Sequence, residues 1–190
     1  KNSFIRILTM IKAVLVFNNN GKVRLMKYYV PDISFKLQQK IIKETYFLIS
    51  KRDYNACNFL DAGKLMGGPY WKLIYKHYAS LYFVFCVDAC ESELGILDLI
   101  EVFVVTLDKI FENVCELDII YNMDKVHYIL NEIIVGGIVL ETDNMEIIKK
   151  VQEQFKFDRN DTSILNPSVV TNLTGTLSLN LHQVIKDFDS

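Results

Sequence analysis

The start of the chain carries a β-hairpin pattern, which constrains the fold more than any other feature because it fixes an antiparallel beginning to the sheet. Ile11 to Phe17 is a β-branched and aromatic run, and Val23 to Val30 alternates apolar with polar residues. Between them stands Asn18-Asn19-Asn20-Gly21. Asn-Gly is a strong hairpin signal because both residues tolerate a positive φ. The two runs are therefore predicted to pair as adjacent antiparallel strands.

An amphipathic helix is predicted directly after the hairpin. Pro31 ends the second strand, and Asp32 or Ser34 can cap a helix that runs to about Lys51. Apolar residues recur along this segment at three- and four-residue spacing, while its other side carries Gln, Lys and Glu. Such a pattern is typical of a helix that lies on one face of a sheet.

Three more segments have a β pattern, at Asn58 to Leu60, Leu73 to Tyr78 and Leu81 to Val87. The last of these is nearly all apolar, so we expect a central strand that is covered on both faces. Five strands joined mainly by short loops must be largely antiparallel, with helices on both faces. The predicted fold class is α/β, of the α+β type.

Only helices are predicted after the last strand. Ser92 can cap the longest of them, Glu93 to Phe111, which is apolar almost all the way round. Such a helix is either central or contacts a partner on its outer side. A third helix, about Lys125 to Val135, is expected to end at Gly136-Gly137. A fourth patterned stretch runs from Asn144 to Phe155.

Composition and charge argue against several classes of protein. Half of the 190 residues are apolar, so the chain can bury a sizeable core in one domain. The net charge of -2 gives no footprint for nucleic acid. No apolar run approaches the ~20 residues that a membrane span needs. The first nine residues lack the apolar stretch and cleavage site of a signal peptide.

Motifs for catalysis, cofactors or metals are not found in the sequence. Gly21-Lys22 lies in the predicted hairpin turn and does not fit a phosphate loop. Cys57, Cys86, Cys90 and Cys115 lack the ligand spacing of a zinc site, and we expect them to be reduced and buried. An enzyme that uses Cys115 or Cys86 as its nucleophile is the alternative from another class. The apolar surroundings of both cysteines disfavour it.

Three features ask for more than core packing or solvation. Arg24 stands on the second strand, where the ordinary interpretation is a solvated strand face. The break from Tyr78 to Leu81 is ordinarily a simple turn between core strands. The long helix has more apolar surface than core burial needs. The carboxylates that follow it, Glu112, Glu116 and Asp118, are interpreted as solvated helix ends or caps.

These stretches resemble the small sigma subunits of the heterotetrameric clathrin-type adaptor complexes. The most specific match is Phe111 to Asp118, Phe-Glu-Asn-Val-Cys-Glu-Leu-Asp. Within the family, Ser92 to Ile100 and the Gly67-Gly68 insertion look most like the sigma subunit of the third adaptor complex. The similarity covers about residues 10 to 150. The other matching segments are Met10 to Leu15, Gly21 to Leu25 and Tyr78 to Phe83.

The resemblance implies a longin-like fold, a five-stranded antiparallel sheet sandwiched between helices. It divides the chain into an N-terminal extension at 1–9, a longin-like sigma adaptin domain at 10–156 and a C-terminal tail at 157–190, poorly ordered or docked. It implies burial against a large, delta-type adaptin subunit, which would account for the over-apolar long helix. The chain would be cytoplasmic and peripheral on Golgi, endosome and transport-vesicle membranes, and would help to carry cargo toward lysosome-related compartments. It implies no enzymatic activity and no cofactor.

The cargo of the family is the acidic dileucine signal, an acidic residue, three spacers, then Leu-Leu or Leu-Ile. Two adjacent leucines need apolar pockets, and the acidic residue needs a cation. By matching position, Arg24 would face the acidic side chain. The small Ala79 would leave room for a leucine, and the Asn113 amide could bond the peptide backbone. The pocket residues that the resemblance implies are Ala79, Leu81, Val104, Asn113, Val114 and Ile119.

Alternatives within binding proteins stay open. One is a purely scaffolding longin-domain protein of a trafficking or tethering complex. Another is the longin domain of a SNARE, although residues 157–190 show neither a heptad pattern nor an anchor. A third is a sigma subunit whose cargo pocket is degenerate.

Overall fold

The computed structural model describes residues 10–31, 33–52, 56–62 and 71–164, with side chains described as far as residue 157. Its contacts divide the chain into two units, Lys1–Lys149 and Lys150–Ser190. Helix α6 (Asn144–Ile164) begins in the first unit and continues in the second. The predicted extension at 1–9, the Asp32 cap, the Gly67-Gly68 insertion and the tail beyond Ile164 lie outside the described residues.

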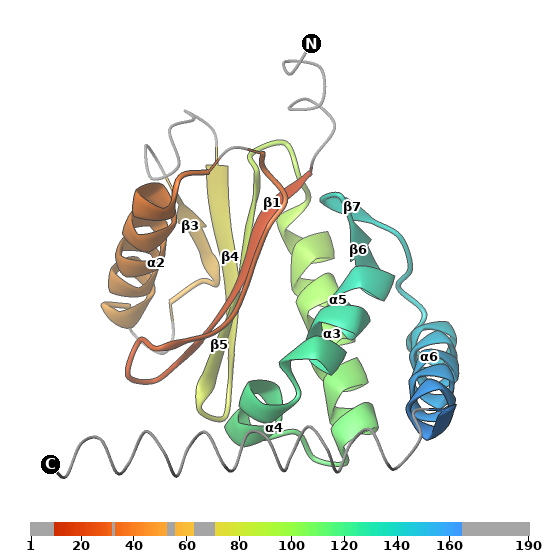
Figure 1. The fold of residues 1–190 in the computed structure, drawn as a ribbon. Helices are drawn as coiled ribbons and strands as arrows, with labels where there is room; N and C mark the ends of the chain where they lie inside the picture. Colours follow the sequence, from red (N-terminus) through yellow and green to blue (C-terminus); the bar gives the residue numbers. More distant parts are fainter. Residues whose placement is uncertain (1–9, 32, 53–55, 63–70, 165–190) are drawn as a thin grey trace, which may run out of the picture. The chain divides into compact units, whose positions relative to one another are not determined.

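A five-stranded antiparallel sheet forms the centre of the first unit, as predicted (Figure 1). The spatial order of its strands is β2-β1-β5-β4-β3, and every neighbouring pair is antiparallel. The apolar strand β5 is therefore central, which confirms the prediction from its sequence. The strands are β1 (Ile11–Asn18), β2 (Val23–Tyr28), β3 (Phe59–Asp61), β4 (Trp71–Tyr78) and β5 (Leu81–Asp88).

Helices cover both faces of this sheet. Helix α2 (Phe35–Ser50) lies on one face, and α3 (Glu93–Phe111), α4 (Glu116–Tyr121) and α5 (Met123–Ile133) lie on the other (Figure 1). The Ser34 hydroxyl accepts a hydrogen bond from the Leu37 amide at 3.4 Å, and the Ser92 hydroxyl accepts one from the Gly95 amide at 3.3 Å. Both serines therefore cap the helices that the sequence assigned to them.

The two faces of the sheet divide the core because successive strand residues point to opposite sides. Leu15 and Phe17 of β1 belong to one buried cluster with Ile41 of α2. On the other side, the ring of Phe83 in β5 meets the ring of Phe103 in α3 edge to face, with centroids 6.0 Å apart and planes at 82°. Burial of each such side chain is worth about 1.5–3 kcal/mol.

The region after α3 differs from the prediction of helices alone. Helix α4 was not expected, and α5 ends at Ile133, before Gly136-Gly137. The chain instead forms a small hairpin of β6 (Ile134–Val135) and β7 (Ile138–Val139). Gly136 and Gly137 form its turn, with φ of 60° and 84°. Two glycines that both adopt a positive φ suit a two-residue hairpin turn. The prediction that Gly136-Gly137 ends the helix is therefore wrong, because these glycines turn the β6–β7 hairpin instead.

Helix α3 has the predicted bounds and leaves part of its apolar surface uncovered in this chain. Its buried side includes Ile100, Phe103 and Leu107. Leu94 is 69% exposed, and Val104 is half-buried. Among the described residues, no helix combines the length and the apolar character needed to cross a membrane.

Candidate functional site

Arg24 is the extra residue of a β-bulge in β2. Successive residues of β1 pair with Leu25 and Val23, so Arg24 has no partner across the ladder. A bulge bends its strand and redirects the side chain of the extra residue. The Arg24 side chain is only 21% exposed. Arg24 is therefore not the ordinary residue of a solvated strand face.

Glu116, the first residue of α4, binds the Arg24 guanidinium. Nη2 and Nε of Arg24 lie 2.6 and 2.7 Å from the same Glu116 oxygen, Oε1. Charge-assisted hydrogen bonds of this length are among the strong ones in proteins. This ion pair joins α4 to β2, two elements that also contact one another. The interpretation of Glu116 as a solvated helix end or cap is wrong, because its carboxylate is committed to Arg24.

Asn18 connects this ion pair to the β1–β2 turn and to the central strand. Its Nδ2 donates to Oε1 of Glu116 at 3.1 Å. Its Oδ1 accepts from the Asn20 and Lys22 amides at 3.0 and 2.9 Å, so the side chain also closes the turn. Asn18 stands opposite Leu81 in the β1–β5 register. Residues far apart in the sequence thus meet at one end of the sheet.

Two consecutive left-handed residues lead the chain out of α3. Glu112 has φ of 52° and Asn113 has φ of 75°. The Val114 amide then donates to Oδ1 of Asp108 at 3.1 Å. The loop that presents Asn113 and Val114 is therefore fixed to the last turns of α3.

Asp118 caps the helix that follows this loop. The Cys115 amide donates to Oδ2 of Asp118 at 2.9 Å. This hydrogen bond favours the carboxylate and lowers the pKa of Asp118 below its ordinary value. The predicted capping role is confirmed for Asp118. This cap stabilises the first turn of α4, to which Glu116 belongs.

Four of the six predicted pocket residues have side chains within reach of solvent. Ala79 lies in the β4–β5 turn, with φ of 50°, and is exposed. Asn113 is also exposed, while Val104 and Val114 are half-buried. A ligand could contact these four without a change in the chain.

The other two predicted pocket residues belong to the core. Leu81 is 5% exposed and Ile119 is 0% exposed. Each has an apolar side chain already covered by this chain itself, so neither offers appreciable surface to a ligand in this conformation.

The ion pair places Arg24, the predicted cation, against the segment from Asn113 to Ile119, which contains three of the six predicted pocket residues. Arg24 bonds to Glu116, which lies between Val114 and Ile119 in the sequence. Leu81 lies near this ion pair because it stands opposite Asn18 in the β1–β5 register, and the Asn18 side chain donates a hydrogen bond to Glu116. Ala79 stands two positions before Leu81, and Val104 lies on α3, which contacts both β4 and β5.

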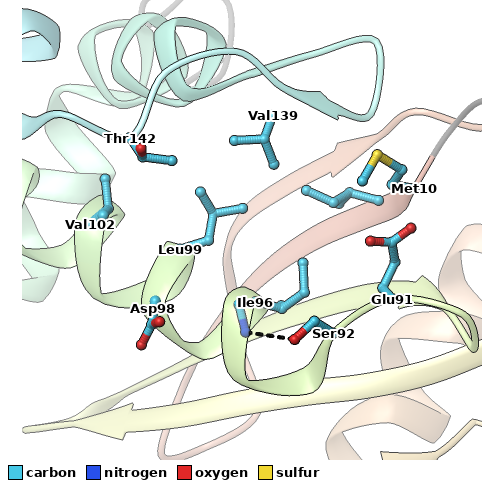
Figure 2. A pocket seen from close by; sticks show the side chains of 11 residues that line it. Met10, Glu91, Ser92, Ile96, Asp98, Leu99, Val102, Val139 and Thr142 are labelled. Atoms are coloured by element: carbon cyan, nitrogen blue, oxygen red, sulfur yellow. Dashed lines mark hydrogen bonds between the residues drawn. The ribbon is translucent and has the colours of Figure 1, made fainter.

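A cavity of about 400 Å³ lies elsewhere, near the start of β1, and sequence reasoning missed it. Figure 2 shows Val139 and Leu99 on opposite sides of the cavity, with Met10 and Glu91 beside one another at one end. None of the predicted site residues lines it. The eight residues from Ile11 to Asn18 span about 24 Å of strand from the first Cα to the last, so this cavity and the Arg24 site are at opposite ends of β1. Its only sequence signal is the apolar outer side of α3.

The cysteines divide into one buried thiol and three exposed ones. Cys86 is fully buried in β5, and burial raises the pKa of its thiol to about 12. Cys57, Cys90 and Cys115 are exposed, which corrects the expectation that all four are buried. A thiol that stays protonated is a poor nucleophile, so Cys86 gives no support to the enzyme alternative.

Comparison with known proteins identifies the family. The family model described as "Clathrin adaptor complex small chain" matches residues 10–158. A structure described as a homology model of the full-length AP-3 complex in a stretched open conformation is similar to this chain, with a TM-score of 0.64 and 38% identity. That similarity covers 83% of this chain and 100% of the other.

Similar proteins come from distant organisms. The AP-3 complex subunit sigma-2 of Homo sapiens is 52% identical over 182 residues, which cover 95% of this chain and 92% of the relative. The AP-3 complex subunit sigma of Dictyostelium discoideum is 50% identical over 83% of this chain and 92% of its own length. That of Arabidopsis thaliana is 47% identical over 87% and 99%.

The human relative also corrects the expected extent of the similarity. Its alignment leaves out only 5% of this chain, which is less than the stretch 157–190, so most of that stretch is aligned as well. The resemblance is therefore not confined to residues 10 to 150. The named relatives are all sigma subunits of AP-3 complexes. The chain belongs to the clathrin adaptor complex small chain family.

Proposed function

We propose that this chain is the sigma-type small subunit of an AP-3-type heterotetrameric adaptor complex, and that it helps to bind acidic dileucine signals of transmembrane cargo. In this role the chain is cytoplasmic and reaches Golgi, endosome and transport-vesicle membranes through the complex. The complex carries cargo toward lysosome-related compartments. The names of the relatives and the structure of an AP-3 complex support the assignment to this complex.

The observation that carries the cargo proposal is the position of Arg24. A partly exposed guanidinium lies against the segment that contains Asn113, Val114 and Ile119, at the end of the sheet where β5 begins. A cation beside apolar residues is the arrangement that an acidic residue followed by two leucines requires. Burial of two leucines contributes about 3–6 kcal/mol before ordering costs, which suits weak and reversible capture.

Exposed apolar side chains support the proposal that a partner subunit, for which we propose a large, delta-type adaptin, covers part of this chain. Among the helices on the α3 side of the sheet, Leu94 of α3 is 69% exposed and Leu117 of α4 is 57% exposed. Tyr121, at the end of α4, is 80% exposed. Large apolar side chains that stay exposed on two consecutive helices are consistent with a surface that a partner covers.

A purely scaffolding role is the second candidate, and one observation favours it. Leu81 and Ile119 are packed into the core, so a ligand that needs their surface must first displace other side chains. A small subunit that only completes the assembly has no such requirement. The two candidates differ in whether substitutions near Arg24 affect peptide capture.

A pull-down separates the two candidates. The chain is co-expressed with an adaptor large-subunit trunk, and the purified pair is presented with an acidic dileucine peptide. Wild type is compared with Val104→Asp, Arg24→Ser and the control Lys40→Ser, which removes a cation from an exposed i,i+4 pair on α2. A second peptide has both leucines replaced by serine.

Cargo binding predicts that Val104→Asp and Arg24→Ser both abolish leucine-dependent capture while Lys40→Ser retains it. All variants should copurify with the trunk. If the trunk copurifies but neither substitution reduces the amount of peptide captured, the chain is a scaffold or its cargo site lies elsewhere. If the wild-type chain does not associate with the trunk, the proposed assembly is wrong.

A further inference from the structure

The geometry of the Arg24 site contains a second charge of opposite sign. Three nitrogens surround a single oxygen, Oε1 of Glu116: Arg24 Nε and Asn18 Nδ2 donate hydrogen bonds to it at 2.7 and 3.1 Å, and Arg24 Nη2 lies in ion-pair contact with it at 2.6 Å. The Arg24 and Glu116 side chains are 21% and 26% exposed. The cation proposed to receive the acidic residue of the cargo is thus already paired within the chain.

The ion pair leaves Arg24 able to bind a second carboxylate. A guanidinium has five N–H groups, and two of them face Glu116: the one on Nε, which donates the hydrogen bond, and one on Nη2, which lies in ion-pair contact. The remaining three belong to Nη1 and to the other side of Nη2. A second carboxylate can bond to these donors while Glu116 stays in place. It then meets a pair whose net charge is zero, and it is repelled by the Glu116 carboxylate across the guanidinium.

We propose that Glu116 is a specificity-determining residue: it holds the Arg24 guanidinium in place and limits how strongly the site prefers an acidic residue in the peptide. This inference rests on the proposed cargo function. In this arrangement the acidic residue of the signal gains less from Arg24 than it would from an unpaired arginine, so the two leucines account for a larger share of the binding. A site with an unopposed arginine would favour acidic segments without regard to the leucines. Glu116 therefore shifts recognition toward the apolar part of the signal.

The substitution Glu116→Gln separates charge from geometry. The glutamine side chain has nearly the same shape and retains an acceptor oxygen for Arg24 and Asn18, but it carries no charge. Glu112→Gln is the matched control, because Glu112 is exposed, lies four positions earlier and loses the same charge. Both variants are prepared with the co-expressed large-subunit trunk, and equal copurification and thermal stability establish that the assembly is intact.

The test measures affinities by fluorescence anisotropy for two peptides with the same two leucines. One peptide has Glu and the other has Gln at the acidic position, so protein and peptide form a double-mutant cycle. Glu116→Gln should raise the affinity for the Glu peptide about three- to tenfold and leave that for the Gln peptide unchanged. Glu112→Gln should change neither by more than about twofold. An unchanged ratio of the two affinities in Glu116→Gln overturns the inference.

A titration with acetate tests the same inference without cargo. The chain has only four arginines, so the Arg24 Nε–Hε resonance can be assigned by Arg24→Lys and followed by NMR in labelled complex. Glu116→Gln should bind acetate at Arg24 at least about threefold more tightly than wild type. Equal acetate affinities contradict the inference. A raised acetate affinity without any leucine-dependent peptide binding upholds the role of Glu116 toward carboxylates and overturns the proposed cargo function.

Discussion

The ring of Tyr46 on α2 lies so close to Gly21 in the β1–β2 turn that a Cβ at Gly21 would be 2.6 Å from Cε1 of the ring. The Tyr46 hydroxyl also donates a hydrogen bond to the Asn19 carbonyl at 2.6 Å. Gly21 has φ of +77°, a conformation that side chains with a Cβ adopt at a cost. The turn and the helix therefore fit together because this residue has no side chain.

Gly21→Ala should destabilise the chain by about 1–3 kcal/mol, since it adds left-handed strain and a clash with Tyr46. Urea unfolding of the purified chain measures the change in the free energy of unfolding. Gly95→Ala is the control, because a Cβ there meets nothing nearer than 3.6 Å and lies in the first turn of α3. That control should be neutral or slightly stabilising. Equal effects of the two substitutions would contradict the close approach at Gly21.

Phe103→Ala should lower the free energy of unfolding by about 3–5 kcal/mol, because it leaves a cavity where α3 packs on the sheet. The Phe103 ring is fully buried and meets Phe83 edge to face. Leu94 lies on the same helix but is 69% exposed, so Leu94→Ala should change the free energy of unfolding by no more than about 0.5 kcal/mol. Thermal or urea unfolding of both variants measures the difference. Similar losses in the two would mean that α3 does not pack on the sheet through the Phe103 side.

The fold of the first unit could be predicted from the sequence where local pattern and burial agree. The Asn-Gly turn, the serine caps and the apolar run of β5 each fixed one element, and the antiparallel sheet follows from their short connections. Helix α4 and the β6–β7 hairpin could not be predicted in this way. Helix α4 has six residues and its N-cap, Cys115, is an unusual one, and β6 and β7 have two residues each.

The site could be predicted only in part, because its key contact depends on tertiary structure. The resemblance supplied Arg24 and the segment from Asn113 to Ile119, and the structure brings these together. The commitment of Glu116 to Arg24 could not be read from the sequence, because 92 positions separate the two residues and a β-bulge directs the arginine. Glu116 and Asp118 look alike in the sequence, yet one is an ion-pair partner and the other a helix cap.

The cysteines should differ widely in reactivity. Burial raises the pKa of the Cys86 thiol from 9.0 to about 12, so at pH ~8 its thiolate is about a thousandfold scarcer than that of an ordinary thiol. Cys57, Cys90 and Cys115 are exposed and should react readily with iodoacetamide. Mass spectrometry after timed labelling of the native chain measures the rates, and labelling in denaturant provides the control. Rapid native labelling of Cys86 would show that β5 is not the covered central strand.

The cap of α4 should respond to pH only in the acidic range. The hydrogen bond from the Cys115 amide lowers the pKa of Asp118 below 3.8, so the folded chain holds this proton less tightly than the unfolded chain. Its stabilisation is therefore complete above the unfolded pKa and is lost as the pH falls through the lower, folded pKa.

A carboxyl-detected NMR titration should give a pKa for Asp118 below 3.8, and the Cys115 amide signal should stay constant from pH ~7 to ~5 and shift only below about pH 4. Asp118→Asn is the matched variant, because its amide oxygen can accept the same hydrogen bond but does not titrate. In that variant the acid-induced shift of the Cys115 amide should disappear. A pKa at or above 3.8, or the same shift in Asp118→Asn, would mean that another group controls the start of α4.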